Sequence, residues 1–289
     1  MNETHFDNRT PVLPDGRYVW LPGRGTTFVR ELAGPEGAPT ILLLHGWTAT
    51  ADLNWFACFA PLAKHFRVVA LDHRGHGRGM RAHPFRLTDC ADDAAALVRE
   101  LGLDRVIPVG YSMGGPIAQL MWQRHPDLVA GIVLCATSCT FSGTVRERAL
   151  FRAAAGASLV AGPVGIAAQS ALHVWNGWRN RRGGDMWWGL DEIARHDLAA
   201  IVEAGRELGR FDSRPWIGGV DVPVAVVVTD ADDVVPTPRQ RDLVSRLVNP
   251  IVKVVHGGHA VCTTHTDRFV PALVDACLDV CRQPVAVAA

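Results

Sequence analysis

Short, uninterrupted runs of apolar residues recur along the chain and dominate its hydrophobic pattern. Strands that are covered on both faces have this pattern, because neither side of such a strand meets water. Six runs predict buried strands at residues 40–45, 67–71, 106–111, 132–136, 222–228 and 251–255. Two further runs, 17–21 and 26–31, are joined by the turn sequence PGRG and predict a hairpin at the edge of a sheet.

Helical periodicity fills most of the intervals between these runs. It predicts helices over residues 89–101, with Thr88 as the N-cap, and over 116–124, 239–248 and 267–281. Strands that alternate with helices indicate βαβ units and a mostly parallel sheet. We therefore predict an α/β protein with an eight-stranded, doubly wound sheet.

One long segment interrupts this alternation. Residues 138–219 contain no convincing strand, are rich in Ala, Arg and Trp, and have helix-like stretches at 145–159 and 190–208. We interpret the segment as an insertion, so that residues 1–137 and 220–289 form the core domain and 138–219 a helical domain of its own.

Composition narrows the choice of partners and compartment. Lys and Arg together number 29, as do Asp and Glu, so the formal net charge is zero. The charge therefore does not favour binding to nucleic acid or to an anionic membrane. No apolar run approaches the roughly 20 residues that cross a bilayer, and the first 16 residues, MNETHFDNRTPVLPDG, lack the apolar core of a signal peptide. Seven cysteines without a CxxC pair favour a reduced, cytoplasmic protein.

The clearest chemical motif is G-x-S-x-G at residues 110–114, GYSMG, which lies between a predicted strand and a predicted helix. A sharp strand-to-helix turn needs small residues on both sides of the serine, and it exposes the hydroxyl at the carboxyl edge of the sheet. The N-terminus of the following helix also favours negative charge that develops beside the serine. Ser112 is therefore a candidate nucleophile.

A serine nucleophile needs a base, and the base needs a carboxylate that orients it. The sequence TDADDVVP follows the strand at 222–228, and HGGHAV follows the strand at 251–255. The carboxyl ends of parallel strands are where α/β sheets hold their sites. Ser, Asp and His thus follow one another along the chain at successive strand ends.

In the motifs LLLHGW, DHRGHG, GYSMGG, DDVVP and GGHA the chain resembles the α/β-hydrolase fold superfamily, over nearly its whole length. The resemblance implies that Asp232 is the acid and His259 the base, with Asp230 and Asp233 as alternatives for the acid. His256, at the end of a strand, is then structural. The chain departs from the family pattern at Thr229, because the family often has Gly three residues before the acid.

The resemblance also assigns an oxyanion hole to the backbone N–H groups of Trp47, in the HGW loop, and Met113. It implies that His45 fixes this loop by hydrogen bonds. It further implies that residues 138–219 form a cap over Ser112. The side chains predicted to contact the substrate are Trp47, Tyr111, Trp175, Trp178 and Trp187.

No cofactor or metal is indicated by the motifs. His73 and His76 lie in a glycine-rich loop without the carboxylate-flanked spacing of a zinc site, and no G-x-G-x-x-G or G-x-x-x-x-G-K-[ST] sequence is present.

The leading functional hypothesis is a serine hydrolase of small to medium apolar carboxylic esters that acts through an acyl-enzyme. The partners are then a small-molecule ester and, at most, a second copy in a homodimer. Three alternatives remain open: a C–C bond hydrolase of a diketone or ring-fission product, a cofactor-free perhydrolase, whose oxyanion loop often reads HGW, and a non-catalytic ligand-binding protein.

Overall fold

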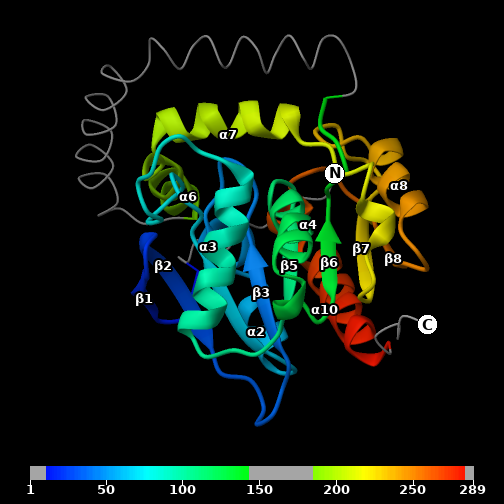
Figure 1. Cartoon of the computed structure of the whole chain (residues 1–289), viewed down its shortest axis with the longest axis horizontal. Coiled ribbons are helices and arrows are strands. Elements are labelled where there is room, and N and C mark those ends of the chain that lie inside the picture. Colours follow the sequence, from blue (N-terminus) through cyan, green and yellow to red (C-terminus); the bar gives the residue numbers. More distant parts are fainter. Residues whose placement is uncertain (1–10, 143–184, 284–289) are drawn as a thin grey trace.

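The computed structural model describes residues 11–142 and 185–283. An eight-stranded sheet with the strand order β1-β2-β4-β3-β5-β6-β7-β8 forms its centre (Figure 1). The strands are β1 (Gly16–Leu21), β2 (Gly25–Leu32), β3 (Thr40–Leu44), β4 (Arg67–Leu71), β5 (Val106–Tyr111), β6 (Ile132–Cys135), β7 (Val224–Thr229) and β8 (Ile251–Val255). The pairs from β4 through β3 to β8 are parallel, whereas β2 pairs antiparallel with β1 and β4. The predicted α/β fold and its edge hairpin are thereby confirmed.

Helices cover both faces of the sheet and create two cores. Side chains of β3 alternate between them: Leu42 and Leu44 belong to one cluster, Ile41 and Leu43 to the other. Residues of α3, α4 and α8 contribute to the first cluster, and residues of α1, α2, α9 and α10 to the second. The helices of the core are α1 (Ala51–Trp55), α2 (Phe59–Ala63), α3 (Leu87–Glu100), α4 (Gly114–Arg124), α8 (Thr237–Arg246), α9 (Val261–Thr264) and α10 (Thr266–Arg282), with short 3-10 turns η1 (Pro126–Leu128) and η3 (Ile217–Gly219).

The prediction of Thr88 as an N-cap is wrong. Helix α3 begins two residues before its predicted start, at Leu87, so that Arg86 takes the N-cap position, and no side chain caps it. Leu87 is almost fully buried in the first cluster, so packing of this residue extends the helix beyond the polar signal. Helices α4 and α8 likewise begin two residues before their predicted starts.

The described part of the segment 138–219 contains two helices, α6 (Asp185–Ala194) and α7 (Leu198–Arg210), where the periodicity predicts a single helix over 190–208. The chain breaks between them because the Asp197 side chain caps α7 and accepts hydrogen bonds from the N–H groups of Ala199 and Ala200. The predicted helix at 145–159 lies outside the described residues. The division into a core and a cap domain stays a prediction.

Helix α7 crosses above the sheet at its carboxyl end (Figure 1). The N–H of Asp197 donates to the carbonyl of Gly75, in the loop that follows β4. Helix α6 is held by a partly buried ion pair, in which Arg78 Nη2 lies 2.7 Å from Oε1 of the buried Glu192. Both α6 and α7 are therefore joined to loops at the edge where the candidate site residues lie.

All seven cysteines lie in the described ranges and all are free thiols. None of the described helices combines the length and hydrophobicity that spanning a bilayer requires.

Candidate active site

Ser112 lies in the sharp turn between β5 and α4 and has a left-handed backbone with φ of 51°. Its two flanking glycines are required by close packing of the backbone. A Cβ at Gly110 would lie 2.2 Å from the carbonyl oxygen of Gly114, and a Cβ at Gly114 would lie 2.0 Å from the carbonyl oxygen of Leu44. The G-x-S-x-G spacing thus permits a backbone conformation that a non-glycine residue adopts only at some cost in free energy.

Neighbouring strands fix this turn. The N–H of Ser112 donates to the carbonyl of Cys135 at 2.9 Å, and the Thr137 hydroxyl donates to the carbonyl of Ser112 at 2.7 Å. These contacts come from the end of β6, so the serine is held from the adjacent strand as well as from its own helix.

The imidazole of His259 connects the serine with a carboxylate. His259 Nε2 lies 2.9 Å from Ser112 Oγ, and His259 Nδ1 lies 2.8 Å from Asp232 Oδ2. Since a carboxylate accepts hydrogen bonds, Nδ1 carries the proton and Nε2 is free to accept the serine proton. Three side chains from the ends of β5, β7 and β8 therefore form one hydrogen-bonded chain.

Asp232 is the one of the three neighbouring aspartates that lies within hydrogen-bond distance of His259. Asp230 pairs with the exposed His256, whose Nδ1 lies 3.0 Å from Asp230 Oδ1, and Asp233 is exposed. His256 is thus placed as the sequence predicted, away from the serine.

Asp232 is buried and accepts hydrogen bonds at both carboxylate oxygens. Oδ1 accepts from the backbone N–H groups of Val234 and Val235, each at 2.9 Å. Burial alone would raise the pKa of this carboxyl group. The hydrogen bond and charge of His259, with the donors Val235 and Thr229, outweigh burial and hold the pKa of Asp232 below its usual value. The acid is thus ionised at neutral pH.

Two residues beside Asp232, Thr229 and Gln240, were not predicted as site residues. The Thr229 hydroxyl and the Gln240 amide both contact Asp232 Oδ2. In the sequence, Thr229 is visible only as a departure from the family pattern. Gln240 could be found as a polar residue that lies on the buried face of α8 together with Leu243.

The backbone N–H groups of Trp47 and Met113 lie in the two turns that flank Ser112. No described residue accepts a hydrogen bond from either N–H group. The loop of Trp47 is fixed by His45, whose Nδ1 donates to the carbonyl of Gly46 at 2.8 Å and whose Nε2 accepts from the N–H of His73 at 2.9 Å. Burial lowers the pKa of His45 to about 3, so this ring stays neutral and keeps one tautomer.

The predicted substrate contacts have different outcomes. The indole of Trp47 donates to the carbonyl of Ile201 in α7 at 2.8 Å, so one edge of it faces the insertion. Tyr111 is 3% exposed, and its hydroxyl donates to the carbonyl of His259 at 2.5 Å. Tyr111 therefore supports the histidine loop from beneath, a position that does not favour contact with the substrate. Trp175, Trp178 and the side chain of Trp187 lie outside the described residues.

Within the described ranges, no cluster of three or more His, Cys, Asp or Glu side chains is arranged to hold a metal ion. His73 and His76 are fully buried, and burial lowers the pKa of both far below the usual value. His45 fills the same interior region, with its ring tilted by 45° against that of His73 and the ring centroids 4.3 Å apart.

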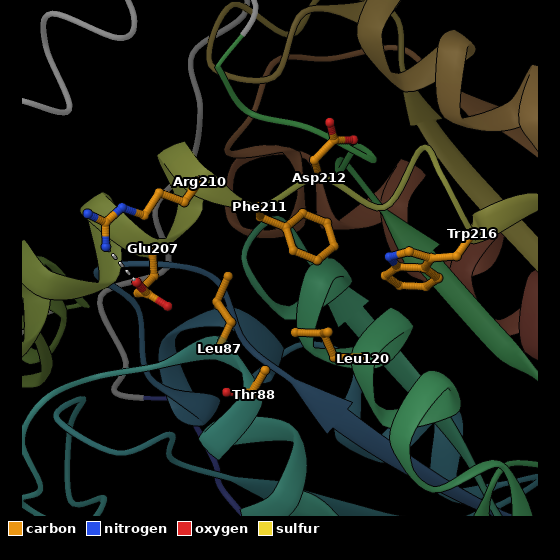
Figure 2. A pocket seen from close by; sticks show the side chains of 8 residues that line it. All are labelled: Leu87, Thr88, Leu120, Glu207, Arg210, Phe211, Asp212 and Trp216. Carbon is orange, nitrogen blue, oxygen red and sulfur yellow. Dashed lines mark ion pairs between the residues drawn. The ribbon is translucent and has the colours of Figure 1, made fainter.

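A separate pocket of about 210 Å³ lies between α3, α4 and the chain that follows α7 (Figure 2). Apolar side chains of Leu87, Leu120, Phe211 and Trp216 surround it, and an ion pair between Glu207 and Arg210 lies to one side of them. None of the predicted site residues lines this pocket.

Comparisons with known proteins identify the family. The family model described as alpha/beta hydrolase fold matches residues 39–170. A relative from Agrobacterium fabrum named "Putative carbamate hydrolase RutD" is 30% identical over 80% of this chain and 90% of its own length. The bifunctional esterase/perhydrolase DCH of Acinetobacter calcoaceticus is 42% identical over 35% of this chain and 37% of its own length.

The likeness extends to solved structures. The enol-lactonase of Burkholderia xenovorans superposes with a TM-score of 0.72 at 21% identity, over 92% of this chain and 100% of that one. This similarity shows the shared fold, while the two relatives above are named as a putative carbamate hydrolase and a bifunctional esterase/perhydrolase. The chain belongs to the α/β-hydrolase fold family.

Proposed function

We propose that the protein is a serine hydrolase that cleaves carboxylic esters through an acyl-enzyme. The observation that carries the proposal is the continuous hydrogen-bonded chain from Asp232 through His259 to Ser112 Oγ, with 2.8 and 2.9 Å between successive heavy atoms. Such a chain makes a serine nucleophilic, because the imidazole can take the hydroxyl proton as the C–O bond forms.

In the proposed reaction, Ser112 Oγ attacks the ester carbonyl while His259 Nε2 accepts its proton. Asp232 stabilises the imidazolium. His259 then gives the proton to the departing alkoxide, which leaves as the alcohol. A water molecule then attacks the acyl-enzyme carbonyl and gives its proton to His259. When the bond from the acyl carbon to Ser112 Oγ breaks, His259 returns this proton to Oγ, which releases the carboxylic acid and the free serine.

The negative oxygen of the tetrahedral intermediate is proposed to bind the N–H groups of Trp47 and Met113. That neither group has an acceptor among the described residues supports this role. A donor of this kind typically contributes about 3 kcal/mol to transition-state stabilisation.

The proposed substrates are small to medium apolar esters, which enter beneath a cap formed by residues 138–219. The esterase named among the relatives supports this class. Trp47 and the tryptophans at 175, 178 and 187 are proposed to line the apolar part of the pocket. No cofactor is included in the proposal.

The test is hydrolysis of p-nitrophenyl butyrate by the purified protein and by Ser112→Ala. We expect the variant to lose a factor on the order of 10⁶ in kcat, which reduces turnover to background. A fluorophosphonate probe is expected to label the wild type and not the variant. Ser245→Ala, an exposed serine on α8, is the matched control and should retain both properties. Unchanged turnover in Ser112→Ala would disprove the assignment.

A second candidate function is perhydrolysis by the same residues. It is favoured by the HGW sequence of the oxyanion loop and by the relative named as a bifunctional esterase/perhydrolase. Hydrogen peroxide would replace water in the attack on an acetyl-enzyme, so acetate and peroxide would give peracetic acid and water. Peracid formation that is absent in Ser112→Ala, measured by oxidation of a halide, would establish this activity.

A further inference from the structure

The departure from the family pattern at position 229 brings an additional hydroxyl group to the acid. Thr229 ends β7 and is fully buried. Its hydroxyl donates to Asp232 Oδ2 at 2.8 Å, and its backbone N–H donates to Gln240 Oε1 at 3.0 Å. A glycine at this position would keep the second bond and lose the first.

Gln240, on α8, completes this arrangement from the other side. It is also fully buried. Its Nε2 lies 2.7 Å from Thr229 Oγ1, 3.1 Å from Asp232 Oδ2 and 2.8 Å from the carbonyl oxygen of Val235. Because the backbone N–H of Thr229 requires an acceptor, the amide oxygen must face it and the NH₂ group must face the acid. The amide therefore has a single orientation.

Three donors consequently meet at one oxygen. Asp232 Oδ2 is contacted by Thr229, Gln240 and His259, while Oδ1 is occupied by two backbone N–H groups. Resting on the proposed function, we propose that Thr229 and Gln240 are positioning residues, which fix Asp232 Oδ2 opposite His259 and limit the strength of its hydrogen bond to the imidazole.

The expected effect follows from competition for negative charge. Each donor to Oδ2 stabilises the carboxylate and leaves less charge to stabilise an imidazolium at His259. When the Thr229 hydroxyl is removed, the imidazolium persists to higher pH. The neutral base then forms at higher pH, and the acidic limb of the pH–rate profile moves upward.

The other titratable groups around this pair are few in the described ranges. Tyr111 approaches from β5, and burial raises its pKa, so it stays neutral. Cys262, on α9, is buried beside Tyr111, and burial raises its pKa to about 12. Asp230, hydrogen-bonded to His256, and Asp233 lie on the solvent side of the same loops. The test therefore leaves these groups unchanged.

The experiment compares Thr229→Val with Thr229→Ser in the full chain. Valine keeps the branched shape that the strand end accommodates but has no hydroxyl, whereas serine keeps the hydroxyl. The acidic limb of kcat/KM for p-nitrophenyl butyrate should move upward by about half a pH unit in Thr229→Val, and kcat/KM at pH 7 should fall roughly 3- to 10-fold. Thr229→Ser should stay within about twofold of the wild type with an unmoved limb.

Equal profiles for Thr229→Val, Thr229→Ser and the wild type would overturn the proposal, since a purely structural role would change stability and leave the limb in place. If Thr229→Val does not fold, Thr229→Ala provides the same test, because alanine has no hydroxyl and leaves the bond from the Thr229 backbone N–H to Gln240 Oε1 in place. An upward shift in this variant supports the proposal, and an unmoved limb overturns it.

Failure of the proposed function can be distinguished from failure of this inference. Fluorophosphonate labelling of the wild type tests the nucleophile alone. The NMR titration of the His259 imidazole, identified by its absence in His259→Ala, tests Thr229 without any substrate. A midpoint that moves upward in Thr229→Val supports the inference even in a protein without esterase activity, and an unmoved midpoint contradicts it.

Discussion

At the scale of single residues, the proposed acid, Asp232, has little freedom to change. Its carboxylate is surrounded by five hydrogen-bond donors and has no donor of its own. An asparagine at position 232 would direct its NH₂ group at one of these donors. In either orientation it would leave a buried donor unpaired or favour the wrong tautomer of His259.

Asp232→Asn is therefore expected to lower kcat by a factor on the order of 10⁴. Asp233→Asn, which changes an exposed carboxylate one residue away, is the matched control and should retain activity. Steady-state kinetics with p-nitrophenyl butyrate measure both variants. A larger loss of activity in Asp233→Asn than in Asp232→Asn would show that Asp233, and not Asp232, is the acid.

The residue scale also shows what a sequence can reveal about a site. Ser112 could be located because its turn requires glycines at fixed positions. The acid could be assigned to Asp232 only through the family resemblance, with Asp230 and Asp233 as alternatives, because the loop after β7 determines which of them reaches His259. Gln240 lies eight residues beyond Asp232 on a different element, and only packing of α8 brings its amide back to the carboxylate. No local pattern predicts such a contact.

At the scale of elements, strands were easier to predict than helices. Three strands, β4, β5 and β8, have the predicted bounds, because burial on both faces makes their apolar runs continuous. Helix ends depend on a few hydrogen bonds and on packing, and these shifted α3, α4 and α8 by one or two residues. The single helix predicted over 190–208 is two helices, because one Asp197 side chain caps a new start.

The contact between α7 and the loop of Trp47 leads to a prediction about coupling between these elements. A Cβ at Gly205 would lie 2.7 Å from Trp47 Cζ2, so Gly205→Ala must displace the indole or the helix. The overpacking costs about 1–3 kcal/mol, which exceeds the gain of about 1 kcal/mol in helix propensity. We expect a lower Tm and, because the Trp47 backbone moves with its ring, a lower kcat/KM.

Gly189→Ala, in α6, is the matched control for this prediction. Among the described residues, its Cβ would meet only Leu53 Cδ1, at an ordinary contact distance of 3.8 Å. It should therefore keep kcat/KM and stabilise the protein by up to about 1 kcal/mol, through the helix propensity of alanine. Thermal unfolding and the pNP-butyrate assay measure both variants. If Gly205→Ala behaves like Gly189→Ala, the α7 contact does not determine the position of the oxyanion loop.

At the scale of the whole molecule, the buried ionisable groups determine how stability depends on pH. Burial lowers the pKa of His45 to about 3 and that of His196 to about 4, and His73 and His76 shift in the same direction. In the unfolded chain these imidazoles titrate near 6.5. Below that pH the unfolded state binds protons that the folded state excludes, so stability falls as the pH falls.

One buried carboxyl group acts in the opposite direction. Burial raises the pKa of Asp72 to about 7, although the N–H groups of Ala51 and Arg78 donate to it. Between about pH 4 and pH 7 the folded state therefore holds a proton that the unfolded state releases. On unfolding near pH 5.5, the four buried histidines each take up about one proton and Asp72 releases one. The net uptake is about three protons.

Three protons correspond to about 4 kcal/mol of stability lost per pH unit. Since domains have about 5–15 kcal/mol in total, we expect acid unfolding within roughly one to four units below pH 6.5. Urea titrations at pH 7, 6 and 5 measure this slope. His196→Asn removes one of the titrating imidazoles and should reduce the slope by about one proton. The fold should be kept, since the asparagine amide oxygen can accept from the N–H of Gly77 as the imidazole Nδ1 does. A stability that stays constant between pH 7 and 5 would mean that these histidines become protonated without unfolding, and that the interior admits water to them.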